Sequence, residues 1–442
     1  MPPPEFEDAV LEKLFPAPTL SALANGPGAE LSPRITSEST AELRRLIIKS
    51  HKRFHVYFSP KGYANHLNHN HILHHLLAVY VLGAPPCVLR DKFDYHSQLL
   101  EPTYKSPGPI STSNWKKHLG NHHYYDSYIK FFTSEIHTRG LNETLTYYLF
   151  VPEGNWGKDE PRMVDRLLGK IIHALIHLGH SLEYGIEGMA VEGLAWTAIH
   201  PTEHQNLFDE QFFAAPQPME HTHAFSIISR MLADVRLEPW KTCNRASLYK
   251  FTETIDSVGP IIRDYVFLWR LGKDTQEIEE RLEELTWCVT VIFGLGGFRD
   301  GKRFTADVFT AHLVTSNHFL SFIIPLLKPT HQAELLRAYF AVVLIYYVCR
   351  GRPSFDFHNF FQLPVANSWR DILASSISKA DEHHVKVERA LARAAILYGH
   401  RPRGTFKHTE LSGAEELDGS LFIKTGAMLS TVSQFGAAWQ CK

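Results

Sequence analysis

Apolar residues recur at spacings of three and four along most of this chain, and this pattern predicts amphipathic or buried helices. The clearest windows cover residues 71–82, 124–137, 141–151, 164–182, 224–237, 255–271, 278–293, 305–327, 332–349, 369–376 and 382–397. Pro260 and Pro325 are expected to bend or break two of these helices. Few windows alternate with a period of two, and no unit recurs at a period of about 20–50 residues. The pattern therefore argues against a β-sandwich, a propeller and a regular solenoid.

The two ends of the chain lack this helical pattern. Residues 1–40 are rich in Pro, Ala, Gly and Ser, with at most one short helix around residues 6–14. A capping pattern, Ser-Thr-Ala-Glu at residues 39–42, predicts the start of the regular structure. We therefore predict a mainly α fold with one large helical domain over residues 41–400. An irregular N-terminal segment precedes this domain, and a C-terminal tail, residues 401–442, packs on it.

Composition narrows the class of protein. The 442 residues include 44% hydrophobic and 21% charged residues, which is ordinary for a globular protein. The net charge is −2, so there is no electrostatic reason to expect nucleic acid or an anionic membrane as partner. The five cysteines are far apart and form no CxxC pair, which argues against a disulfide framework and against a thiolate zinc site.

We expect a cytoplasmic location, because the sequence shows neither a signal-peptide pattern nor an apolar run long enough to cross a membrane. The N-terminus shows no signal-peptide pattern, and the odd, scattered cysteines suit a reducing compartment. The longest uncharged apolar run, residues 338–349, is well short of the roughly 20 residues that cross a bilayer. We interpret this run as part of a buried core helix.

The common catalytic motifs are missing. The sequence has no GxGxxG after a strand, no GxxxxGK[ST], no HExxH, no GxSxG and no His-Asp pair. Hydrolase and phosphoryl-transfer interpretations therefore lose their usual support. What stands out is the number of histidines, 27 in all, and imidazole is both a metal ligand and an acid–base group.

Two histidine clusters lie in apolar helical windows. His71, His74 and His75 share one helical face, which also carries part of the apolar pattern. Each of them alone suits a hydrogen-bonded core histidine as well as a ligand. His173 and His177 are one turn apart in an otherwise apolar helix, so both can reach one ion. Here we favour a metal, because coordination removes the cost of burying unpaired imidazoles.

Two further positions leave both interpretations open. His312 is a lone imidazole in an apolar stretch and, taken alone, suits a satisfied core histidine. His383 and Lys386 are one turn apart in a polar segment, where a lysine is usually solvated. A lysine beside a metal takes part as a neutral amine, or as a carbamate after CO₂ adds to it. A carbamate would supply the carboxylate that the usual two-histidine iron site needs and that the apolar histidine segments lack.

Several of these segments resemble the questin oxidase-like family. The matching stretches, in the family's order, are NHILHHLL at 70–77 with LGA at 82–84, Asn-Trp at 114–115 with Leu-Gly at 119–120, HALIHLG at 173–179, HLVTS at 312–316, and HHVK at 383–386 with Arg-Ala-Leu at 389–391. The resemblance spans about residues 50–400. Ala174 and His180 stand where the family pattern has Pro and Tyr.

The resemblance implies an oxidoreductase of fungal polyketide pathways that opens an anthraquinone ring with O₂. Enzymes of this family have been described as Baeyer–Villiger-like and NADPH-dependent, although this sequence has no recognisable flavin or nicotinamide motif. Our hypothesis is a mononuclear non-haem Fe(II) oxygenase with His177, His312 and Lys386 as its catalytic group. The metal ligands are expected among these residues: His71, His74, His173, His177, His312, His383 and Lys386, the last as a carbamate.

Three alternatives remain open at the level of sequence. The first is a metal-independent, NADPH-linked Baeyer–Villiger monooxygenase in which these histidines act as acids and bases. The second is a non-catalytic helical protein that binds an aromatic polyketide. The third is a zinc hydrolase, since four nitrogen ligands would also suit zinc.

Overall fold

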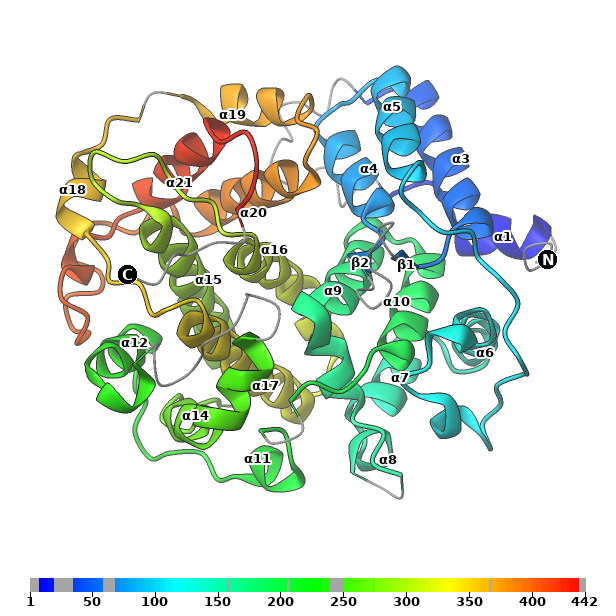
Figure 1. The fold of residues 1–442 in the computed structure, drawn as a ribbon, viewed down its shortest axis with the longest axis horizontal. Helices are drawn as coiled ribbons and strands as arrows, with labels where there is room; N and C mark the ends of the chain where they lie inside the picture. The colour runs from blue at the N-terminus through cyan, green and yellow to red at the C-terminus, as the bar shows by residue number, and fades with distance from the viewer. Residues whose placement is uncertain are drawn as a thin grey trace. The chain divides into compact units, whose positions relative to one another are not determined.

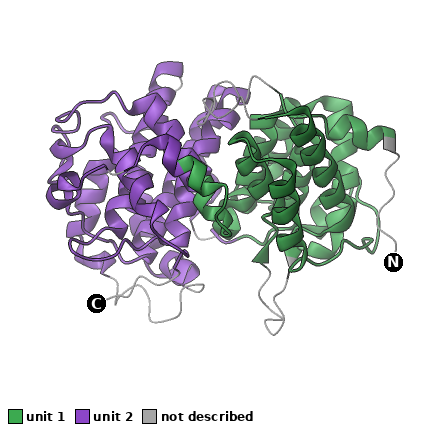
Figure 2. Ribbon diagram, turned by 90° about the horizontal axis from the view of Figure 1, so that it is seen from above, with its two compact units in different colours: residues 1–202, 373–386 green, residues 203–372, 387–442 purple. Residues whose placement is uncertain are grey.

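The structure, a computed structural model, describes residues 8–19, 35–58, 68–156, 159–204, 207–238, 250–272, 274–365 and 367–436. Helices dominate these residues, which confirms the prediction of a mainly α fold (Figure 1). The chain divides into two compact units (Figure 2). The first comprises residues 1–202 and 373–386, and the second comprises residues 203–372 and 387–442. The single domain expected over residues 41–400 stays a prediction.

The first unit is built from helices that begin near the N-terminus. Its elements are α1 (Asp8–Leu14), α3 (Ser37–Arg53), β1 (Tyr57–Phe58), β2 (Asn68–His69), α4 (Ile72–Val81), α5 (Pro86–Ser97), 3₁₀ turns at Trp115–His118 and His122–Tyr124, α6 (Tyr125–Arg139), α7 (Leu141–Leu145), a π-helical turn at Thr146–Phe150, α8 (Pro152–Asn155), α9 (Met163–Tyr184) and α10 (Glu187–Ile199). The two short strands pair antiparallel, with Tyr57 opposite His69.

The second unit has a core of long apolar helices. Its elements are α11 (Glu210–Ala214), α12 (Ala224–Ala233), α14 (Lys250–Val266), α15 (Thr275–Gly297), α16 (Val308–Ile323), α17 (Pro329–Cys349), α18 (Phe357–Gln362) and α21 (Ser420–Ser430), with 3₁₀ turns at Val235–Leu237, Ile324–Leu326 and Ala414–Glu416. Two helices, α19 (Trp369–Ser376) and α20 (Glu382–Tyr398), contribute residues to both units.

Local sequence explains where several helices begin and end. The capping box of α3 lies at Thr36 and Ser39, whose backbone and side chains bond reciprocally, so the start predicted at residues 39–42 is three residues late. Pro325 ends α16 in a 3₁₀ turn, as predicted, whereas α14 continues through Pro260 without a break, and a bend at Pro260 stays a prediction.

The C-terminal tail contains more helix than predicted, and the apolar run at residues 338–349 is helical as predicted. The C-terminal tail was predicted to be irregular, but it contains α21, which packs against α15. The run at residues 338–349 lies in α17, as predicted. Among the described helices, α17 alone is long and apolar enough to cross a bilayer, and 83% of its apolar window is buried inside the structure. That burial is typical of a core helix.

Helix α9 contains a break that the sequence pattern did not indicate. Lys170, Ile171 and Ile172 adopt φ values of 49°, 59° and 62°, the left-handed region that L-residues avoid. β-Branched isoleucines are especially unfavourable there. The strained turn therefore separates the first part of α9 from the part that begins at His173, and strain of this kind is concentrated at functional sites.

The partner of this second part is α10. The two helices run side by side, and a Cβ placed on Gly193 of α10 would lie 3.2 Å from the backbone nitrogen of Leu178. A larger residue at 193 would push the helices apart. The absence of a side chain there lets Glu192, the neighbouring residue on α10, face His177, the neighbouring residue on α9.

Replacing Lys170 by Gly tests the left-handed turn. Glycine adopts positive φ without the Cβ penalty, so K170G should preserve or raise the free energy of unfolding, by at most about 1 kcal/mol. Urea denaturation followed by far-UV circular dichroism measures the change. The control is E279G, on the exposed face of the regular helix α15, which should lose about 1 kcal/mol. An equal loss in K170G would contradict the turn.

Candidate metal centre

The first unit gathers five of the predicted ligand histidines from three helices. His71 is the N-cap of α4 and His74 lies in its first turn, His173 and His177 follow the break in α9, and His383 lies in the first turn of α20. The His71 ring centroid is 4.8 Å from that of His173 and 5.4 Å from that of His383. The His74 and His177 centroids are 5.2 Å apart. Segments distant in the sequence thus form one histidine cluster.

A buried carboxylate fixes the orientation of His177. Glu192 accepts hydrogen bonds from His177 Nε2 at 2.9 Å and from His51 Nδ1 at 2.7 Å. Burial raises the pKa of Glu192, but these two hydrogen bonds outweigh it and hold the pKa at about 2. Glu192 is therefore ionised and only accepts, so both imidazoles must donate to it.

The tautomer of His177 in turn determines which ring nitrogen of His74 carries the proton. With neutral rings, His177 carries its proton on Nε2, so its Nδ1 accepts from His74 Nε2, 3.0 Å away. The remaining lone pair of His74 is then on Nδ1. That nitrogen is buried and has no hydrogen-bond partner in the part of the chain that the structure describes. Burial, followed by the charges of His180, His177 and Lys386, lowers the pKa of His74 well below 6.5, so its ring is neutral.

In two other predicted ligands, an oxygen atom also accepts a hydrogen bond from one ring nitrogen. His173 Nδ1 is 2.6 Å from the carbonyl oxygen of Lys170, and His383 Nδ1 is 2.8 Å from a carboxylate oxygen of Asp381. These bonds place the proton on Nδ1 and the lone pair on Nε2. A carbonyl or carboxylate behind the ring is what ligand histidines in metal sites have.

His173 also faces a second imidazole. Its Nε2 lies 3.3 Å from His71 Nε2. Two nitrogens that bind one ion at about 2.1 Å are about 3.0–3.4 Å apart in octahedral or tetrahedral geometry. The spacing of this pair, and that of His74 and His177, therefore fits two ligands of one cation, and a hydrogen bond between neutral rings gives the same spacing.

His312 lies in the second unit, in α16. Its Nδ1 is 2.6 Å from the carbonyl oxygen of Val308, so its proton is also held by a backbone oxygen. Its place among the ligands stays a prediction. His200 has the same kind of bond, to the carbonyl of Arg166. A hydrogen bond to a backbone carbonyl therefore does not by itself identify a metal ligand. The ligands are inferred from the histidines that lie close together in the first unit.

The structure adds a carboxylate that sequence spacing missed. His71, Glu382 and His383 each offer a ligand atom, and these atoms lie within 4.8 Å of one another. The Glu382 carboxylate is 3.6 Å from both His71 Nε2 and His383 Nδ1. Burial raises the pKa of Glu382, and the neighbouring His383, Lys386 and His96 lower it more. Two histidines and one carboxylate are the usual protein ligands of non-haem iron.

Lys386 lies one turn further along α20 and is buried. Its Nζ makes no hydrogen bond to any residue that the structure describes. Burial lowers the pKa of Lys386, while Glu382 and Asp381 raise it. The prediction that this lysine belongs to a site, against its usual place in solvent, therefore gains support from its burial.

Aromatic and apolar groups enclose the cluster. The indole of Trp196 on α10 packs against the rings of His74 and His177, with centroids at 6.2 and 5.3 Å. His180, at the position where the family pattern has Tyr, stacks on His74 at 4.8 Å. A small pocket beside His177 and Glu192 is lined by Phe54, Leu73, Tyr125 and Trp196 among others. These walls reduce the access of water and strengthen electrostatic interactions in the cluster.

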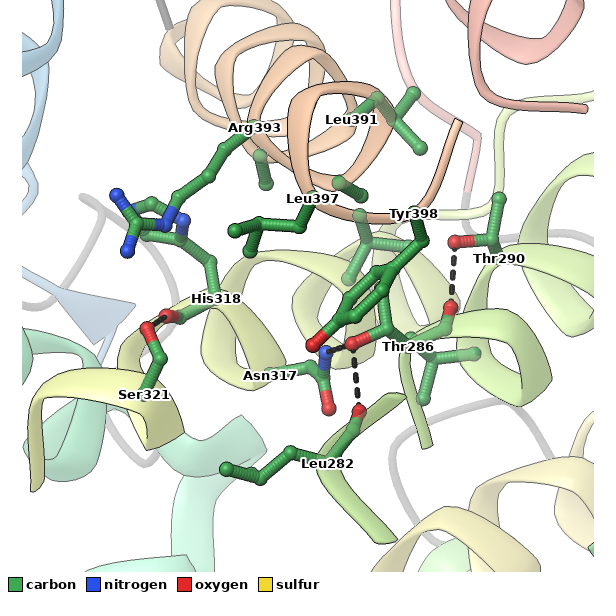
Figure 3. A pocket seen from close by; sticks show the side chains of 14 residues that line it. Leu282, Thr286, Thr290, Asn317, His318, Ser321, Leu391, Arg393, Leu397 and Tyr398 are labelled. Atoms are coloured by element: carbon green, nitrogen blue, oxygen red, sulfur yellow. Dashed lines mark hydrogen bonds between the residues drawn. The ribbon is translucent and has the colours of Figure 1, made fainter. Parts of the chain in front are cut away.

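A different kind of pocket lies in the second unit, between α15, α16 and α20 (Figure 3). It encloses about 440 Å³, counting its open mouth, and its walls are mostly apolar. Asn317 donates from Nδ2 to Thr286 Oγ1 at 2.8 Å, and Thr286 donates to the carbonyl of Leu282. The amide oxygen of Asn317 is buried and accepts no hydrogen bond from the described residues. The pocket thus presents one buried acceptor to its interior.

Not every buried histidine belongs to the metal centre. His55 accepts from the backbone N–H of Tyr57 at Nδ1, 3.0 Å away, and its Nε2 lies 3.1 Å from the carbonyl of His122. Both ring nitrogens are therefore used, as in a structural histidine. Burial lowers the pKa of His55 to about 4, despite the carbonyl bond.

Comparison with known proteins agrees with the resemblance to the questin oxidase-like family. The family described as questin oxidase-like matches residues 68–391. A Baeyer–Villiger monooxygenase of Cryptosporiopsis sp. is 22% identical over 422 residues, which cover 89% of each chain. A questin oxidase of Aspergillus terreus is 23% identical over 369 residues, or 78% of each chain. A Baeyer–Villiger oxidase of Paecilomyces divaricatus is 23% identical over 387 residues, or 82% of this chain and 80% of the other.

The titration of His55 gives a pH-dependent prediction. An unfolded histidine titrates near 6.5 and folded His55 near 4, so its stabilising contribution is complete above pH 6.5 and is lost as the pH falls from 6.5 to 4. This loss is at most about 1.4 kcal/mol per pH unit. Asn at position 55 can still accept from Tyr57 N–H but does not titrate.

The measurement is the free energy of unfolding of wild type and H55N at pH 7.5, 6.5, 5.5 and 4.5. Other histidines titrate in both proteins and cancel in the difference. The advantage of wild type over H55N should shrink at each step below pH 6.5. A constant difference across this range would show that His55 does not carry the neutral, doubly bonded ring described above.

Proposed function

The chain belongs to the questin oxidase-like family of oxidoreductases, and from this premise we propose that it opens the ring of an anthraquinone-type polyketide with O₂ at a mononuclear non-haem iron site. The observation that carries the proposal is the histidine cluster of the first unit. Its ring protons are held by Glu192, Asp381 and the Lys170 carbonyl, so the remaining nitrogens of His177, His383 and His173 carry the lone pairs.

The residues fit a bound iron. The facing ring nitrogens of His71 and His173, and of His74 and His177, have the spacing of two ligands of one ion. Lys386 Nζ is buried and has no hydrogen-bond partner among the described residues, and a buried polar atom left in this way costs roughly 1–3 kcal/mol. We propose His71 or His74, together with His173, His177 and Lys386, as the ligands that the first unit offers, with His383 as an alternate ligand or a partner of a ligand. His312 is proposed from its sequence context. Bound here, iron would supply the activation of O₂.

The protein's own residues then have separate tasks. Glu192 holds His177 in one tautomer and one orientation, and His51 holds Glu192 from its other side. Trp196 and the stacked His180 restrict the movement of the His74 ring and limit access of water. The anthraquinone ring, which is flat and apolar, would need an apolar slot lined by aromatic side chains.

Lys386 is proposed to act as a carbamate. The neutral amine of lysine attacks CO₂, a C–N bond forms, and one proton leaves to give an anionic carbamate. This change replaces an ammonium that would be expensive to bury by a group that can bind a cation. Glu382 is the competing carboxylate, since it lies beside His71 and His383.

The names of the relatives favour a second candidate function. Several are named Baeyer–Villiger oxidases or monooxygenases. We propose as the alternative a Baeyer–Villiger oxygen insertion that uses NADPH as electron donor and no metal. The buried imidazoles would then act as acids and bases. Full activity of purified protein that holds less than about a tenth of an equivalent of iron would rule out the iron mechanism and favour this alternative.

His177 provides the direct test of the iron site. H177A should lose bound iron and turnover of the anthraquinone together, because it removes a ligand nitrogen. E192Q retains the ligand but frees its ring, so it should weaken iron binding by about 10–100-fold. Iron is measured by inductively coupled plasma mass spectrometry, and turnover by oxygen consumption.

H55N is the matched control for this experiment, since His55 is buried in the same unit with both nitrogens occupied. It should bind iron as wild type does. Iron content and rate that are unchanged in H177A would remove His177 from the site.

The carbamate gives a separate prediction. Wild type equilibrated with ¹³C-bicarbonate should show a carbamate carbon resonance in ¹³C NMR, and K386A should lose that resonance and its iron. K386E places a carboxylate on a shorter stem and should recover part of the iron binding. If K386A keeps iron while E382Q loses it, Glu382 is the carboxylate ligand and the carbamate is wrong.

A further inference from the structure

A second group of possible ligands lies in the first unit, beside the cluster described above. His75 comes from α4, His96 from the last turn of α5, and Glu382 from the first turn of α20. One ligand atom from each lies within 4.8 Å of the others. His75 and His96 are both buried, at 0% and 7% exposure. Neither is among the predicted ligands of the iron site.

The spacing within this group suits a cation. His75 Nδ1 and His96 Nε2 are 2.9 Å apart. Two nitrogens in adjacent positions of an octahedral ion, each at about 2.1 Å, are separated by about 3.0 Å. Two imidazoles and one carboxylate suit first-row divalent transition metals such as Fe²⁺, Mn²⁺, Co²⁺ and Zn²⁺ better than Mg²⁺ or Ca²⁺, which take oxygen ligands.

The protein alone satisfies these groups only in part. The facing nitrogens of the two rings share one hydrogen bond, which uses one lone pair, whereas a bound cation would use the lone pairs of both. The Glu382 side chain is 12% exposed, and the ring nitrogens of His71 and His383 lie 3.6 Å from its carboxylate, beyond hydrogen-bond distance. A mostly buried carboxylate with no hydrogen bond to these rings is expensive.

We propose that His75, His96 and Glu382 form a second site for a divalent transition metal. The cation would tie α5 and the first turn of α20 to α4, and so would hold His383 and Lys386 in place. Glu382 is then a ligand of this second site, and the Lys386 carbamate supplies the anionic ligand of the iron site. This proposal does not require iron at His173 and His177, since its two nitrogen ligands are different residues.

Titration of the metal-free protein with Co²⁺, followed by its visible absorption bands and by metal analysis after gel filtration, tests the proposal. Wild type should bind two equivalents, H96N one, H177A one, and the double variant H96N/H177A none. H55N, the matched buried histidine of the same unit, should bind as many as wild type. Equal binding by H96N and wild type would overturn the second site.

The outcomes also separate this proposal from the proposed function. If the iron site is wrong and the second site is right, wild type and H177A each bind one equivalent and H96N binds none. Crystals of wild type soaked with Co²⁺ need no substitution, which covers the case in which H96N does not fold. An anomalous peak between His75, His96 and Glu382 supports the proposal, and no peak there at full occupancy elsewhere overturns it.

Discussion

A neutral imidazole has one donor and one acceptor, and the first unit buries many of them in an apolar helical core. Whichever group takes the proton of a ring decides which nitrogen keeps its lone pair. At His177 that group is Glu192, at His383 it is Asp381, and at His173 it is a backbone carbonyl. Buried oxygens thus determine which nitrogens the cluster presents, because each oxygen accepts and does not donate.

Two backbone features of the first unit bring these oxygen partners to the histidines. The left-handed turn at Lys170–Ile172 is costly, and it brings the Lys170 carbonyl to His173 Nδ1. The close approach of α9 and α10 at Gly193 brings Glu192 to His177. The first feature departs from helix geometry, the second omits a side chain, and each gives a histidine its oxygen partner. In this way the fold of the first unit is linked to the chemistry of the cluster.

Apolar residues at helical spacing predicted α6, α9 and α15, and the same spacing within mostly apolar runs predicted α4 and α17, which are buried along most of their length. It missed α10, where two glycines and two glutamates lie among the apolar residues, and α5, where charged residues interrupt the pattern. Apolar neighbours in the sequence predicted the burial of His173 and His177, whereas the polar segment around Lys386 favoured a solvated side chain, and only the family resemblance pointed to a site there. The roles of Glu192 and Glu382 could not, because they depend on contacts between helices that are separate in the sequence.

Glu382 and Lys386 show how far an arrangement can depart from local rules. They lie four residues apart on α20, with the acid on the N-terminal side, which is the preferred spacing for an ion pair on a helix. Both are buried, so an ion pair would relieve the cost of each. Yet Lys386 Nζ has no hydrogen-bond partner in the described chain, and the nearest ring nitrogens to the Glu382 carboxylate lie at 3.6 Å. The two side chains therefore do not form this ion pair, and the proposed metal sites give each of them another partner, Glu382 as a carboxylate and Lys386 as a carbamate.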